Sequence, residues 1–173
     1  MSDATYMGLN EMSKEDAIRY HVKKLAELTR ITSEPDSPTT GVAVDPYPYL
    51  TVAKQYEGRD EDDDNDELRE FLGINPSETA WCAAFVGACL RDAGLPTIST
   101  LRARDFAGYG EAGDGSIGDI AVWRNHVAFV ADTDPEEKVI GGNQSDQVNT
   151  SPKNWYDRYS EFLGYRRPPT AVA

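Results

Sequence analysis

The feature that most constrains the fold is a change of hydrophobic spacing in the second half of the chain. Residues 79–94, TAWCAAFVGACLRDAG, follow a plausible N-cap at Ser77, carry apolar side chains at helical spacing and end at a glycine. Short apolar runs separated by turn residues come next: DIAVW (119–123), HVAFVAD (126–132) and KVIGGNQ (138–144). Such runs are typical of adjacent antiparallel strands that are buried on both faces. Helices followed by a small sheet predict an α+β fold.

The length of 173 residues fits one domain with an N-terminal appendage. Residues 13–30 have a capping box and apolar side chains at helical spacing, so they predict an amphipathic helix. Residues 31–48 are rich in Pro, Ser, Thr and Gly, which is typical of an extended connector. We therefore divide the chain into an N-terminal helix with connector, residues 1–45, and a main domain, residues 46–173.

The charge of the chain excludes several classes of partner. Seventeen Lys and Arg against thirty Asp and Glu leave a net charge of -13, which repels nucleic acid and anionic membranes. No apolar run approaches the roughly 20 residues that cross a bilayer. The first eleven residues have neither the basic start nor the apolar stretch of a secretory signal. The sequence predicts a soluble protein that is made in the cytoplasm.

An acidic run between the predicted helices raises the question of a metal ion. Residues 57–70 hold nine acidic residues and two basic ones, a pattern typical of a solvated loop. Calcium stays open as an alternative, although the run lacks the glycine and the terminal acid of an EF-hand loop. The Cys and His residues are too scattered for a zinc site. We therefore expect neither a metal ion nor a cofactor.

Few residues are available for nucleophilic catalysis, because the chain has two cysteines and two histidines. Cys82 lies in the first turn of the predicted helix, where unpaired backbone N–H groups and the helix dipole stabilise a thiolate. Cys89 lies two turns further along, too far for a disulfide, and is expected to be an inert core residue. His21 falls inside the N-terminal amphipathic helix and is expected at its boundary.

The other histidine is the candidate base. His126 opens a predicted strand and shares a face with Ala128 and Val130, so it approaches Cys82 if that face packs against the central helix. Asn143 ends the following strand and is placed to orient the imidazole across a short hairpin. The alternative is structural, because a free cysteine and a strand histidine are often satisfied core residues.

Several segments together resemble a known family. They are PYLTVAKQYEG, ELREFLGI, SETAWCAAFVGACLRDAGLP, LRARDFAGYGE, GDIAVWRNHVAFVAD, VIGGNQSDQV and LGYRRP. Over residues 46–168 the chain is similar to the small papain-like peptidoglycan hydrolases of the CHAP and NlpC type, and most of all to the branch found in phage lysins. The resemblance implies a papain-like fold, in which helices with the nucleophile at a helix N-terminus pack on a small antiparallel sheet.

The activity that the resemblance implies is that of a cysteine amidase or endopeptidase, which cuts amide bonds in the peptide stem of peptidoglycan. By match to the family's motifs, Cys82 is the nucleophile, His126 the base and Asn143 the third polar residue. Family members usually carry a glycine directly before the histidine, and this sequence has Asn125 there.

Three further residues are candidates for substrate binding. Trp81, beside the nucleophile, either lines the cleft or plugs the core. Arg104 either holds a carboxylate of the peptide stem or is an ordinary exposed residue near acidic neighbours. Gln144 is a candidate second donor to the oxyanion, beside the backbone N–H of the nucleophile.

The biological setting has three alternatives. The first is a phage endolysin or a virion-associated lysin, made in the host cytoplasm and acting on the wall after release. The second is an interbacterial toxin amidase. The third is a papain-like structural component of a virion or other assembly, without catalysis. Under the virion and the structural alternatives, residues 1–45 are the natural segment for docking to a partner.

Overall fold

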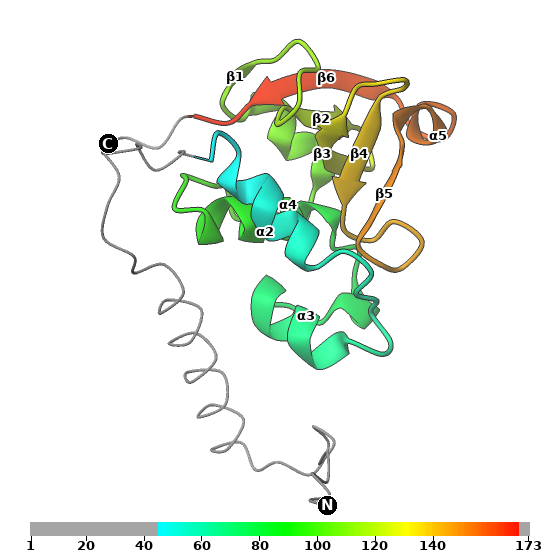
Figure 1. Ribbon diagram of the computed structural model, residues 1–173. Coiled ribbons are helices and arrows are strands. Elements are labelled where there is room, and N and C mark those ends of the chain that lie inside the picture. The colour runs from blue at the N-terminus through cyan, green and yellow to red at the C-terminus, as the bar shows by residue number, and fades with distance from the viewer. Residues whose placement is uncertain (1–44, 170–173) are drawn as a thin grey trace, which may run out of the picture. The chain divides into compact units, whose positions relative to one another are not determined.

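The computed structural model describes residues 45–169, and the strands of this part form one sheet (Figure 1). In chain order they are β1 (Glu111–Ala112), β2 (Ile120–Trp123), β3 (Val127–Asp132), β4 (Lys138–Gly141), β5 (Asn149–Pro152) and β6 (Phe162–Arg167). The order in the sheet is β1-β6-β2-β3-β4-β5, and all neighbouring strands run antiparallel. The last strand therefore lies inside the sheet, between β1 and β2. The structure combines helices with an antiparallel sheet, as an α+β fold requires.

The helices of this part come mostly before the sheet. They are α2 (Pro48–Gln55), α3 (Asn65–Leu72), α4 (Cys82–Asp92) and α5 (Lys153–Asp157), with short 3-10 turns η2 (Pro76–Glu78) and η3 (Ala103–Gly108). The predicted stop of α4 is confirmed: Gly94 has a φ of 74°, and the Leu95 N–H donates to the Leu90 carbonyl over 2.9 Å. Positive φ after a helix favours glycine, which has no Cβ to clash.

The predicted start of the central helix is wrong by one turn. The residues after Ser77 form the separate turn η2 and then an extended stretch, and α4 begins only at Cys82. Trp81 is the N-cap residue, with a φ of -120° and no capping hydrogen bond from its side chain. Cys82 is thus the first residue of the helix.

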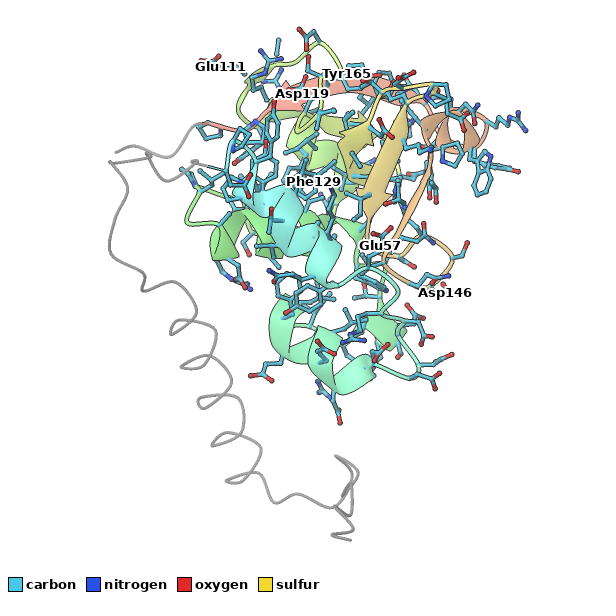
Figure 2. All side chains as sticks on the ribbon, viewed as in Figure 1. Glu57, Glu111, Asp119, Phe129, Asp146 and Tyr165 are labelled. Carbon is cyan, nitrogen blue, oxygen red and sulfur yellow. The ribbon has the colours of Figure 1, made fainter. Side chains whose placement is uncertain are left out.

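Both faces of the central strands are buried, as predicted. On one face Val122, Val127 and Phe129 belong to the core that includes α2, α3 and α4. Figure 2 shows Phe129 in this core, where its ring lies 5.1 Å from that of Tyr49 on α2. The opposite face is filled by a second, smaller cluster, whose buried members are Ala121, Trp123, Ala128, Val130 and Val139.

Among the described residues, no helix has the length and apolar character to cross a bilayer. The predicted N-terminal helix, with His21, and most of the connector lie outside the described residues. The division at residue 45 therefore stays a prediction.

Candidate functional site

Cys82 lies at the N-terminus of α4 with its side chain directed into the protein. Its exposed fraction is 4%. The backbone N–H groups of Val127, Ala83 and Cys82 itself lie against the sulfur and lower the pKa of the thiol. Val127 is the residue directly after His126 in the chain, so α4 brings the sulfur beside the peptide that carries the candidate base.

Burial acts on the thiol in the opposite sense and is the larger effect. It raises the pKa of Cys82 above its ordinary value, because a thiolate loses its hydration in the interior. The N–H groups at the helix N-terminus lower the pKa of the thiol, whereas the larger effect of burial raises it, so the net shift is opposite to the one expected from the helix N-terminus alone. The cysteine rests as a thiol and needs a base to accept its proton.

His126 lies just before β3 and is also buried, with an exposed fraction of 8%. Burial lowers the pKa of its imidazole to about 4, and a hydrogen bond with Gln144 offsets part of this effect. The imidazole of His126 is therefore uncharged at neutral pH. A neutral imidazole is the form that accepts a proton from a thiol.

The route by which His126 reaches the nucleophile differs from the expected one. Ala128 and Val130, which were expected to share its face, lie in the smaller cluster on the side of the sheet away from α4. The core around α4 contains Val127 and Phe129 instead. The sulfur of Cys82 lies beside the Val127 N–H, at the start of β3 and next to the peptide of His126.

Gln144 fixes the orientation of the imidazole. Its Oε1 lies 3.0 Å from Nε2 of His126, and its exposed fraction is 1%. Its Nε2 donates to the backbone oxygen of Asn149 at 2.6 Å and to the Asn149 Oδ1 at 2.9 Å. Because the amide nitrogen is engaged there, Oε1 is the acceptor that faces the ring. Nε2 of His126 therefore carries the hydrogen, and Nδ1 is the basic nitrogen.

This arrangement corrects two predictions about the loop after β4. The residue that orients His126 is Gln144, not Asn143. The amide nitrogen of Gln144 donates to two oxygen atoms of Asn149, so Gln144 is not the second donor to an oxyanion. Among the hydrogen bonds of residues 45–169, none involves the Asn143 side chain.

The physical reason for the error is the end of β4. In the β3–β4 pair, Phe129 is opposite Ile140 and Val130 is opposite Val139, and extending this register would place Asn143 opposite His126. The strand ends at Gly141, however, and Asn143 has a φ of 55° in the left-handed region. The turn carries the next side chain toward the imidazole.

The ring of Tyr156 on α5 lies flat on His126, a contact that the sequence analysis did not anticipate. The ring centroids are 4.3 Å apart and the planes differ by 14°. The ring of Trp123 also contacts the imidazole, with centroids 5.7 Å apart and a 38° tilt. No spacing or motif links residue 156 to residue 126, so no signal in a single sequence identifies this neighbour.

Trp81 and Arg104 do not form a substrate cleft around these residues. Trp81 is fully buried, and its indole N–H donates to the Glu61 carboxylate over 2.7 Å. Of its two predicted roles, it therefore has that of a core plug. Arg104 is exposed on η3. Within the described part of the chain, no hydrogen bond or ion pair joins it to Cys82 or His126.

The acidic run forms its own compact turn. The Asp60 carboxylate accepts the backbone N–H groups of Asp62 and Asp63 at 2.9 Å and 2.8 Å. The Asp64 carboxylate accepts the N–H of Asp60 at 3.2 Å. Across residues 45–169, no three or more His, Cys, Asp or Glu side chains are grouped so that they could hold a metal ion.

A groove of about 520 Å³ runs along α4 next to the nucleophile. Its wall includes Ala83 and Ala84, the two residues after Cys82, and the loop from Thr97 to Leu101 lies across from them. A larger cavity of about 700 Å³ is lined by Tyr47, Ile117 and Arg167 among others, and neither Cys82 nor His126 lines it. Neither Cys82 nor His126 lines either hollow, and the groove beside α4 comes nearest to Cys82 along the chain, at Ala83.

Comparisons with known proteins add no family to this description: no family model and no curated protein matches the chain. Its function has to be inferred from the site itself.

Proposed function

We propose that the protein is a papain-like cysteine amidase or endopeptidase that cuts amide bonds in the peptide stem of bacterial peptidoglycan. The observation that carries the proposal is the arrangement of three buried side chains. Cys82 heads α4 beside the peptide of Val127, and the adjacent His126 is held at Nε2 by Gln144 over 3.0 Å. A nucleophile, a base and a group that orients the base are the parts that covalent amide hydrolysis needs.

The chemistry begins with a proton transfer inside the site. Because Nε2 of His126 is engaged by Gln144, Nδ1 accepts the proton of the Cys82 thiol as the sulfur attacks the scissile carbonyl. The sulfur–carbon bond forms, and the negative charge moves to the carbonyl oxygen. The backbone N–H of Cys82, at the N-terminus of α4, is placed to stabilise that oxyanion.

The tetrahedral species then collapses with the imidazolium as the acid. His126 gives its proton to the leaving amine, the carbon–nitrogen bond breaks, and an acyl-enzyme remains on Cys82. In the second half His126 takes a proton from water, and the hydroxide attacks the thioester to form a second tetrahedral species. The carbon–sulfur bond then breaks, the carboxylic acid leaves, and the proton on His126 returns to the sulfur. Because both side chains are buried, desolvation disfavours their charged forms in the free protein.

The choice of substrate rests on the resemblance of the sequence and on the groove along α4. Small side chains at Ala83, Ala84 and Gly87 line this groove, which starts at the residue after Cys82 and has room for an extended peptide. The net charge of -13 gives no long-range attraction to an anionic wall, so the interaction is local. The setting that we propose is a phage lysin, free or carried in the virion, made in the host and acting on its wall.

Mass spectrometry of muropeptides released from purified cell wall tests the proposal. The native protein is expected to release fragments with new amine and carboxyl ends, and Cys82→Ala is expected to release none. Cys89→Ala is the matched control, because Cys89 is also a buried free cysteine of α4. Equal release by native protein and Cys82→Ala, with both shown to be folded by circular dichroism, would contradict the proposal.

A further inference from the structure

The imidazole of His126 is held on its face as well as at its edge. The Tyr156 ring lies parallel to it, with centroids 4.3 Å apart and planes within 14°. Gln144 meets the ring edge at Nε2. A hydrogen bond at one edge leaves the imidazole free to rock about that bond, whereas a parallel ring at van der Waals distance blocks this motion.

Tyr156 is itself fixed by the neighbours of α5. Asp157, the next residue, accepts the indole N–H of Trp123 at 2.8 Å and the ammonium of Lys153 at 2.9 Å. The Lys153 ammonium lies 3.9 Å from the centroid of the Phe162 ring. These contacts tie α5 to β2 and β6, so the tyrosine ring has a rigid support.

The hydroxyl end of Tyr156 meets the same polar network that holds Gln144. The Ser151 hydroxyl lies beside the Tyr156 hydroxyl and lowers the pKa of this phenol, although burial raises that pKa by more. Ser151 also donates to the Asn149 side chain, and Asn149 binds the amide of Gln144. The face contact and the edge contact on His126 are therefore joined through β5.

We propose that Tyr156 is a positioning residue for the catalytic base: its ring holds the His126 imidazole in the plane in which Nδ1 meets the proton of Cys82, and shields that face from water. The catalytic consequence rests on the proposed function, whereas the effect on the imidazole itself does not.

No charged side chain accounts for the lowered pKa of His126, because burial lowers it and the hydrogen bond with Gln144 partly offsets that effect. The loop after β4 presents the neutral amide of Gln144 to the imidazole. The Cys82 sulfur at the start of α4 lies against the backbone N–H of Val127, the residue that follows His126. On α5 Lys153 and Asp157 pair with each other and are directed to Trp123. Removal of the tyrosine ring therefore admits water to the imidazole without changing a neighbouring charge.

Three variants separate the ring from its hydroxyl and from its helix. Tyr156→Leu removes the aromatic ring, and Tyr156→Phe keeps the ring and removes the hydroxyl. Tyr159→Leu is the matched control, because Tyr159 follows three residues later and is 84% exposed. With a soluble muropeptide as substrate, we expect kcat to fall about tenfold in Tyr156→Leu with little change in KM, as for lost orientation. Tyr156→Phe keeps the ring and is expected to lose less of kcat than Tyr156→Leu, and the Tyr159→Leu control is expected to match the native protein.

The second readout needs no activity. Proton NMR follows the ring of His126, assigned by comparison with His21→Gln. Tyr156→Leu is expected to move the imidazole pKa from about 4 toward the ordinary 6.5, and Tyr156→Phe and Tyr159→Leu are expected to leave it in place. The native protein is expected to show His126 ring protons shifted upfield by the stacked ring, a measurement that does not depend on any variant folding.

An unshifted native signal overturns the proposal, and so does a Tyr156→Leu protein that is folded and keeps the native imidazole pKa. An equal loss of kcat in Tyr156→Leu and Tyr159→Leu also overturns the proposal, because a general effect on this part of the chain then explains the result. If no variant and no native preparation cuts peptidoglycan but the NMR results hold, the proposed function fails while the positioning of His126 by Tyr156 stands.

Discussion

The Oε1 atom of Gln144 and the Nε2 atom of His126 lie 3.0 Å apart inside the protein, joined by a hydrogen bond that solvent hardly reaches. An amide oxygen in this place accepts a hydrogen bond without bringing a charge, so it selects one tautomer of the imidazole and leaves its protonation to burial. A carboxylate in the same place would favour the imidazolium. The neutral amide of Gln144 is therefore consistent with an imidazole that is uncharged in the free protein.

Gln144→Ala is expected to lower kcat by about ten- to a hundredfold, because the imidazole loses both its tautomer and its orientation. Asn143→Gly is the control: Asn143 has a φ of 55°, which glycine adopts without strain, and it is expected to keep native activity. Muropeptide release under initial-rate conditions measures both. Greater sensitivity at residue 143 than at residue 144 would restore Asn143 as the orienting residue.

Stability is expected to fall as the pH is lowered from about 6.5 to about 4. The pKa of His126 is near 4 in the folded protein and near 6.5 when the chain unfolds, so the unfolded chain binds the proton first. The free energy of unfolding should decrease by about 2 to 3 kcal/mol from pH 7.5 to pH 4.5 on this account. Urea unfolding at both pH values measures it. His126→Gln should remove this part of the decrease, and an unchanged pH dependence in that variant would contradict the assignment.

Gly142→Ala is expected to destabilise the protein by about 1 to 3 kcal/mol through overpacking. A Cβ at this position would lie 2.4 Å from the Trp81 ring and 2.7 Å from the Phe85 Cβ. Gly108→Ala is the control, because a Cβ there meets nothing within 4 Å. Urea midpoints compare the two, and similar midpoints would mean that Trp81 can move aside. Displacement of Trp81 also moves the start of α4, so activity is expected to fall with stability.

Glu61→Ala is expected to lower the free energy of unfolding by about 1 to 3 kcal/mol, because it leaves the buried indole N–H of Trp81 without its acceptor. Glu61→Gln keeps an acceptor and is expected to lose less. Asp63→Ala, an exposed neighbour in the same acidic run, serves as the control and is expected to be nearly neutral. Thermal unfolding ranks the three. Equal effects of Glu61→Ala and Asp63→Ala would indicate that the charge of the run matters and the indole contact does not.

The elements that could be predicted from the sequence are those with strong local patterns. The spacing of apolar residues from Cys82 to Leu90, followed by Gly94, predicts α4 and its end. Strands β2, β3 and β4 are short apolar runs between turns. The place of β6 could not be predicted, because it pairs with β1 and β2, which are distant in the chain. Such pairings are decided by the packing of the whole sheet and leave no local trace.

The candidate site divides in the same way. Cys82 and His126 could be chosen because Cys and His are scarce in this chain and lie at the start of predicted elements. The orienting role was predicted one position early, at Asn143, and Gln144 was predicted as an oxyanion donor, since the register of β4 stops at Gly141 and a positive φ follows. Tyr156 was missed altogether, because its contact with His126 depends on how α5 folds back onto the sheet.

The place of β6 inside the sheet has a consequence for biosynthesis. While the nascent chain is still emerging from the ribosome, β2 has only β3 beside it, and its other edge is unpaired until residues 162–167 follow. An unpaired strand edge can pair with other chains and aggregate. We therefore expect chaperones to bind the nascent chain until β6 has been synthesised. A ribosome that stalls before these residues would release a chain with an open edge, which aggregates or is degraded.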